Sequence, residues 1–197
     1  LGEDGKPDPA GAAFIRTVEH GFYEDWYSDE KLERLQPALA EDNQQCTGVF
    51  VDPGFAALEP WDEALEQIGF DAALHPVGTF VDYDKTLNAG GELLPARLVT
   101  GVTVNPGFRR RGILKHMMTT ALARAVQDEM PLVALTVSEG SIYGRFGFGA
   151  ATRWHAVRID VSGAPAFTGA PAGGRVTVEE PREIPGLVDE LYGRVLP

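Results

Sequence analysis

The chain has 197 residues, 44% of them hydrophobic, so it can bury the core of at least one domain, which argues against global disorder. Its net charge of -12 argues against DNA or RNA as a partner, because nucleic-acid binding needs a basic surface, whereas a negative field attracts cationic substrates such as amines. The one cysteine, Cys46, excludes an internal disulfide and fits a reducing compartment. No apolar run approaches the ~20 residues that span a bilayer, so we expect a cytoplasmic protein without a membrane partner.

Hydrophobic periodicity and turn residues predict strands and helices along most of the chain. The predicted elements are, in order, a strand at 14–19, a helix at 28–41, a strand at 48–51, a short helix at 61–68, strands at 77–83 and 98–104, a helix from 113, a strand at 132–137, a short helix at 141–146, a strand at 151–161 and a helix at 184–195. Ser28 is the expected N-cap of the first helix, and Pro37 is expected to kink or end it. The continuous apolar run at 132–137 is typical of a parallel strand covered on both faces.

Residues 102–114 have the sequence Val-Thr-Val-Asn-Pro-Gly-Phe-Arg-Arg-Arg-Gly-Ile-Leu, a β-branched strand that leads through a basic turn into an amphipathic helix. A helix start offers backbone N–H groups without intrahelical partners and the positive end of the helix dipole, and Gly112 lets a ligand approach the backbone. The arginines of this turn run against the negative charge of the whole chain. The stretch therefore predicts a site for a cofactor that bears a pyrophosphate.

The same turn carries a family resemblance. Arg109-Arg-Arg-Gly-Ile-Leu114 resembles the R-x-x-G-x-(small or apolar) motif of the GNAT acyl-CoA N-acetyltransferases. A second block at 135–149, Leu-Thr-Val-Ser-Glu-Gly-Ser-Ile-Tyr-Gly-Arg-Phe-Gly-Phe-Gly, makes the pair of blocks similar to the Eis (enhanced intracellular survival) branch of that superfamily. The resemblance covers roughly residues 77–160. Leu114 stands where many GNAT enzymes have a small residue, as is usual in the Eis branch.

The resemblance implies an α/β GNAT fold, with a mixed central sheet in which two parallel strands splay apart and leave a V-shaped gap for acyl-CoA. Gly101, inside the strand at 98–104, fits a bulge or a close backbone approach there. We expect a GNAT domain at 1–161, a Gly-, Ala- and Pro-rich linker at 162–175, and the beginning of a second, incomplete GNAT-like domain at 176–197.

Site residues follow from the resemblance, position by position. The backbone of one strand would pair with the pantetheine arm, through Val102, Thr103 and Val104. The turn and the helix start would surround the pyrophosphate, through Arg109, Arg110, Arg111, Gly112, Ile113, Leu114 and Lys115. Two residues at the end of the parallel strand would border the cofactor, namely Ser138 and Glu139. No metal is expected, because the four histidines are scattered without metal-ligand spacing.

Tyr143 is the expected catalytic residue. A phenol with a pKa near ~10 can protonate a thiolate leaving group. The alternative is a structural tyrosine that packs on Phe146 and Phe148. Glu139 is a further candidate to accept the proton of the amine. In Eis enzymes the C-terminal carboxylate is taken as the general base, and we do not carry that role over to Pro197.

The resemblance thus implies an acetyl-CoA-dependent N-acetyltransferase that acetylates a primary amine by direct attack in a ternary complex. Aminoglycosides, polyamines and lysine side chains are the acceptors that the family offers. The alternatives are a non-catalytic acyl-CoA-binding regulatory module and a plain interaction domain. Eis-type proteins assemble as hexamers, so a homo-oligomer is expected.

Overall fold

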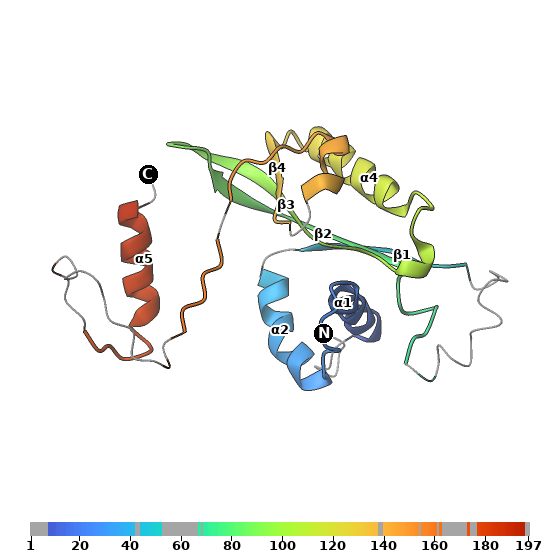
Figure 1. Cartoon of the computed structure of the whole chain (residues 1–197), viewed down its shortest axis with the longest axis horizontal. Helices are drawn as coiled ribbons and strands as arrows, with labels where there is room; N and C mark the ends of the chain where they lie inside the picture. Colours follow the sequence, from blue (N-terminus) through green and yellow to red (C-terminus); the bar gives the residue numbers. More distant parts are fainter. Residues whose placement is uncertain are drawn as a thin grey trace. The chain divides into compact units, whose positions relative to one another are not determined.

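The computed structural model describes residues 8–41, 44–52, 67, 69–137, 140–153, 155–160, 162, 173 and 177–195, with the backbone alone at 36–41 and 195. The chain divides into two compact units (Figure 1). One comprises Leu1–Leu87 and Leu93–Phe148, and the other Asn88–Glu92 and Gly149–Pro197. The first unit contains the sheet and the predicted site.

The sheet in the described residues has four strands in the order β1 (Gln45–Val49), β2 (Gly78–Asn88), β3 (Leu93–Val104) and β4 (Leu132–Leu135). β1 runs antiparallel to β2, with Gln45 opposite Asp82. β4 runs parallel to β3, from the pair Ala96–Leu132 to the pair Val99–Leu135. The parallel strand predicted from the apolar run at 132–137 is therefore confirmed, although it ends two residues earlier.

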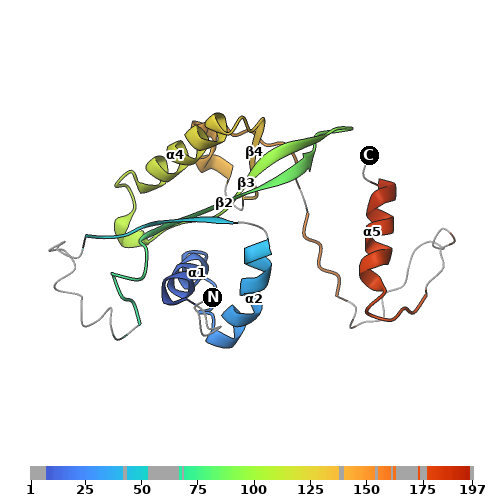
Figure 2. The same ribbon diagram turned by 180° about the vertical axis from the view of Figure 1, so that it is seen from behind.

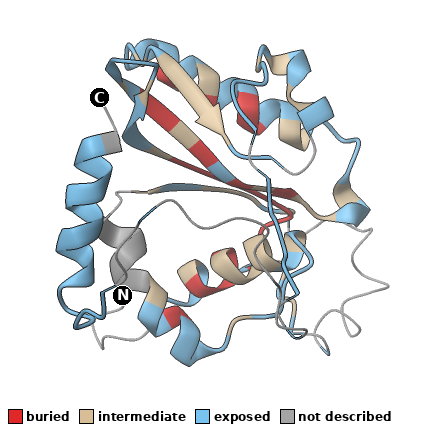
Figure 3. Cartoon of the chain, turned by 60° about the vertical axis from the view of Figure 1, so that its left-hand side comes forward, coloured by how far each residue is buried: buried red, intermediate tan, exposed pale blue. Residues whose placement is uncertain are grey.

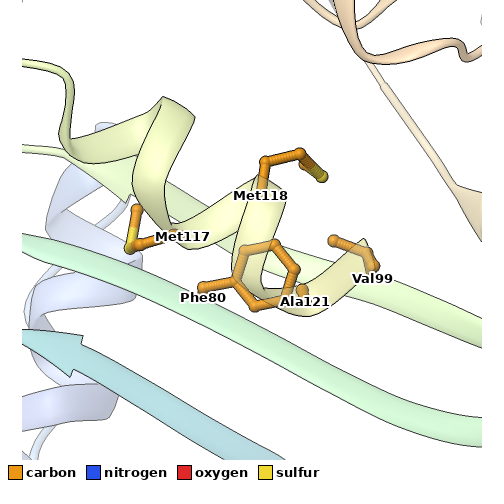
Figure 4. Packing of buried hydrophobic residues seen from close by; sticks show 5 residues of the cluster. All are labelled: Phe80, Val99, Met117, Met118 and Ala121. Atoms are coloured by element: carbon orange, nitrogen blue, oxygen red, sulfur yellow. The ribbon is translucent and has the colours of Figure 1, made fainter. Parts of the chain in front are cut away.

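Helices cover both faces of this sheet. α1 (Pro9–Gly21) and α2 (Asp29–Glu41) lie on one face and α4 (Ile113–Gln127) on the other (Figures 1 and 2). Buried residues gather along the strands and on the helices that pack on them (Figure 3). Under α4 the core is made by Phe80, Val99, Met117, Met118 and Ala121 (Figure 4). The predicted helix from residue 113 is confirmed, and its methionines anchor it to the sheet.

The strand predicted at 14–19 is wrong, because these residues lie in α1. Asp8 caps this helix by accepting a hydrogen bond from the Gly11 N–H at 2.8 Å, and Pro9 occupies the first turn, where its missing N–H costs nothing. Ala12, Ala13 and Phe14 are buried. Capping and burial thus outweigh the β-branched and aromatic content that favoured a strand.

Several other predicted elements can be compared with the structure. The helix at 28–41 is confirmed as α2, with Ser28 Oγ accepting from the Lys31 N–H at 3.3 Å, and it continues past Pro37. The helix at 184–195 is confirmed as α5 (Ile184–Val195).

The strand predicted at 151–161 is absent from the described residues 151–153 and 155–160, which are exposed and pair with no neighbouring strand. The predicted helix at 61–68 lies outside the described residues apart from Gln67. None of the described helices is long and apolar enough to cross a bilayer.

Candidate functional site

β3 extends beyond the end of its parallel neighbour. The last β3–β4 pair is Val99–Leu135, and no described residue pairs with residues 100–104 on the β4 side. Gly101 follows this pair with a φ of 58°, a left-handed conformation that disfavours other residues, and a Cβ there would lie 3.0 Å from Val81 Cγ2. A left-handed glycine inside a strand fits the bulge expected at this position. Among the described residues, the edge of β3 thus has no strand partner, and is here called open, where the resemblance places the acyl-CoA gap.

Two buried threonines hold the backbone at Gly101. Thr79 Oγ1 donates to the Gly101 carbonyl at 2.8 Å and lies 2.6 Å from Thr103 Oγ1. Thr79 is fully buried, and Thr103 packs against the end of α1 at Gly21. The Thr103 side chain is therefore occupied within the fold, so only its backbone could meet a cofactor.

The direction of the backbone groups at the end of β3 follows from one hydrogen bond. The Asn105 N–H donates to the Val77 carbonyl at 2.8 Å, on the β2 side. Because residues that face one neighbouring strand alternate with residues that face the other, the backbone groups of Val102 and Val104 face the open edge and those of Thr103 face β2. Of the three predicted pantetheine residues, Val102 and Val104 are thus the better placed.

The turn after β3 begins with a 3-10 helix, η2 (Pro106–Phe108), in which Asn105 Oδ1 accepts from the Gly107 N–H at 3.0 Å. Arg109 Nε then donates to the Val104 carbonyl at 3.2 Å, and the Arg111 guanidinium lies 5.3 Å from the centre of the Phe108 ring. Arg110 has a φ of 65°. All three arginines are exposed, so the turn presents three cations beside the open strand edge.

Gly112 starts α4 without a side-chain cap. Its φ is 84°, and a Cβ there would meet no described heavy atom within 4 Å. The first intrahelical bond runs from the His116 N–H to the Gly112 carbonyl at 2.9 Å, so helix geometry leaves the N–H groups of Ile113, Leu114 and Lys115 without intrahelical acceptors. Backbone donors, the positive helix end, open space at glycine and three arginines together fit a diphosphate.

Tyr143 lies between two short 3-10 helices, η3 (Gly140–Ile142) and η4 (Gly144–Phe146). It is half-buried, contacts the Phe148 ring edge-on at 6.0 Å and packs, as Phe146 does, against the core under α4. Burial raises the pKa of the Tyr143 phenol, which keeps it protonated. These contacts are compatible both with a proton donor and with the structural alternative. Ser138 and Glu139 lie outside the described residues.

Sequence reasoning missed an ionic network at the other end of α4, in which Arg97 and Asp82 are buried and the other members are partly exposed. Arg97 donates to both carboxylate oxygens of Asp84, at 2.9 and 3.1 Å, and to Asp128, the C-cap of α4, at 2.7 Å. Arg124 reaches both oxygens of the buried Asp82 at 3.2 Å. Burial raises the pKa of Asp82, although both guanidinium groups act in the opposite direction. The network ties α4 to β2 and β3, and so helps to fix the helix whose first turn forms the candidate site.

The described part of the chain contains no group of three or more His, Cys, Asp or Glu side chains that could hold a metal ion. The groups that the described residues bring to the edge of β3 and the start of α4 are backbone donors and arginines.

Comparison with known proteins identifies the domain. Residues 62–151 match the family described as the acetyltransferase (GNAT) domain. The chain is 37% identical over 123 residues to an N-acetyltransferase Eis of Mycobacterium bovis, and 38% identical over 122 residues to an uncharacterized N-acetyltransferase of Streptomyces griseus. These matches cover 60% and 59% of this chain but 31% and 29% of the relatives, so the chain spans about a third of their length.

The fold is shared with solved acetyltransferases. A Trypanosoma brucei acetyltransferase superposes with a TM-score of 0.53 over 78% of this chain and 96% of its own, at 14% identity. The expected GNAT fold is thus confirmed. A second GNAT-like unit at 176–197 stays a prediction. The chain therefore carries a GNAT acetyltransferase domain whose sequence is similar to that of the N-acetyltransferases named Eis.

Proposed function

We propose that this chain binds acetyl-CoA along the open edge of β3 and at the start of α4, and that it transfers the acetyl group to a primary amine in a ternary complex. The observation that carries the proposal is that the strand edge and the helix start follow each other directly in the chain. A strand edge without a described partner at residues 100–104 leads directly into three exposed arginines and an uncapped helix start. Bound acetyl-CoA supplies an acyl group activated as a thioester.

In this proposal the residues divide into two binding regions. The backbone groups of Val102 and Val104 hold the pantetheine arm as an added strand would be held, since they face away from β2. The arginines of the turn and the N–H groups at the start of α4 hold the diphosphate. Holding both ends of an extended ligand orients its reactive end, which by itself lowers the barrier to attack.

Tyr143 is the proton donor in the proposed reaction. Its raised pKa means that the phenol carries its proton at neutral pH, as a general acid must. Its ring is held by Phe148 and by the core under α4, so the position of its hydroxyl is restricted. Departure of the thiolate is the step that such a donor assists.

The acceptor is proposed as a class. The net charge of -12 favours a cationic amine, and the resemblance to Eis adds aminoglycosides, polyamines and lysine side chains. We further propose that the protein is a cytoplasmic homo-oligomer, and its mass in solution tests the oligomeric state.

Two measurements test the function. Calorimetric titration with CoA is expected to give saturable binding. Release of free CoA from acetyl-CoA, followed with a thiol reagent, is expected to accelerate when an aminoglycoside, spermidine or a lysine peptide is added. Saturable binding without amine-dependent release would instead identify a non-catalytic acyl-CoA-binding module. Absence of binding would leave a plain interaction domain.

A further inference from the structure

The Arg109 side chain folds back onto the end of β3. Its Nε donates to the Val104 carbonyl at 3.2 Å, across the 3-10 helix formed by Pro106–Phe108. Its neighbour Arg110 has a left-handed backbone and is likewise exposed. The two arginines are therefore not equivalent, although each carries one positive charge in the same turn.

The Val104 carbonyl belongs to the open edge of β3. The adjacent Asn105 N–H is bonded to Val77 on the β2 side, so the backbone groups of Val104 face the other way. An extended ligand on this edge would meet alternating donors and acceptors from Val102 and Val104. Arg109 takes one of the two lone pairs of the Val104 carbonyl, so this carbonyl is a weaker acceptor for a ligand than the Val102 carbonyl. The edge therefore offers first the Val104 N–H and both groups of Val102.

We propose that Arg109 is a positioning residue, which sets the register of the pantetheine arm on β3 by occupying the Val104 carbonyl. The inference rests on the proposed function and goes beyond it, since an arginine in this turn would otherwise serve as a phosphate ligand alone. The bond engages Nε, so Nη1 and Nη2 can contact a diphosphate at the same time. One guanidinium thereby links the diphosphate region to the strand edge. Without this bond both lone pairs of the Val104 carbonyl are open, and the carbonyl competes with that of Val102 for an amide of the arm.

The matched pair Arg109→Met and Arg110→Met tests this role, because each variant removes one charge and every side-chain hydrogen-bond donor from one position of the same turn. The readout is the change in the backbone amide signal of Val102 in an NMR spectrum when CoA is added to saturation. Saturation removes any difference in affinity, and the hydrogen bond of Arg109 goes to Val104 and not to Val102. Both variants are expected to bind CoA more weakly, by about tenfold or less, since each loses a charged contact.

At saturation, Arg110→Met is expected to show the same CoA-induced shift at Val102 as the unchanged protein, whereas Arg109→Met is expected to show a different one. If Arg109→Met also gives the unchanged shift, Arg109 only binds phosphate and the inference is overturned. If the unchanged protein shows no CoA-induced shift, the proposed function itself fails, which is a separate outcome. Because Arg109 is exposed, signals outside the turn should be the same in both variants without CoA, which verifies that the fold is intact.

Discussion

Replacement of Gly112 by alanine tests the backbone conformation of the turn, because Gly112 has a left-handed φ that disfavours a residue with a Cβ. Gly112 has a φ of 84°, where a residue with a Cβ loses roughly 1–2 kcal/mol. Part of this loss is offset, because alanine restricts the unfolded chain and so contributes about 0.4–1 kcal/mol to stability. The new Cβ meets no described atom within 4 Å, so no steric clash adds to the strain. The expected net loss in the free energy of unfolding is about 1 kcal/mol.

The same substitution should weaken CoA binding. Relief of the strain rotates the backbone at Gly112 and turns the N–H groups at the start of α4 away from the diphosphate. A loss of about tenfold in affinity is expected, equivalent to ~1.4 kcal/mol. Urea denaturation measures the stability, and calorimetric titration with CoA measures the affinity.

Gly107→Ala is the matched control. Gly107 lies in the same turn, does not have a positive φ, and would place its Cβ 3.5 Å from Asn105 Oδ1, an ordinary contact. It should leave stability unchanged or slightly raised and CoA affinity unchanged. Equal behaviour of the two variants in both measurements would refute the reasoning about the turn.

Three further predictions concern the neighbouring groups. Tyr143→Phe should lower turnover by about 100-fold and leave CoA affinity unchanged. In the unchanged protein turnover should fall when the pH rises above the raised pKa of the phenol, and the variant should lack this fall. Equal pH–rate profiles of the two proteins would contradict the role of Tyr143 as an acid. Thr79→Val should lower the free energy of unfolding by about 1–3 kcal/mol, because the buried Gly101 carbonyl loses its donor, whereas Thr79→Ser should retain most of it in urea denaturation. Arg97→Ala should cost about 1–3 kcal/mol in the same assay, since it removes the buried guanidinium that joins Asp84 to Asp128 and leaves Asp82 with Arg124 alone. Arg194→Ala, in an exposed pair with Glu190, should have no measurable effect.

The turn and the helix start of the candidate site could be predicted from the sequence because their signals are local. The arginines, Gly112 and the helical periodicity that follows lie within one short stretch, and the uncapped start of α4 is found where that stretch placed it. The parallel strand at β4 was likewise marked by a continuous apolar run.

Other features depend on partners that lie far away in the sequence. The residues of α1 contain enough β-branched and aromatic side chains to favour a strand, and the helix is decided by the Asp8 cap and by burial of Ala12 and Ala13 against the sheet. The strand predicted at 151–161 has the right composition, but a strand also needs a neighbour, which composition does not supply. The ionic network joins Arg124 to Asp82 across 42 positions, a separation that no local pattern reveals. The bond from Arg109 to Val104 is an exception, since it spans only five positions, but it forms only if the turn brings the side chain back to the strand, which the sequence pattern does not reveal.

A crystal structure of the protein with CoA tests the central claim most directly. The account predicts that the diphosphate lies within hydrogen-bond distance of the backbone N–H groups at the start of α4, with the pantetheine arm along Val102 and Val104. A diphosphate bound elsewhere on the protein, with the 109–115 segment making no contact to phosphate, would contradict it.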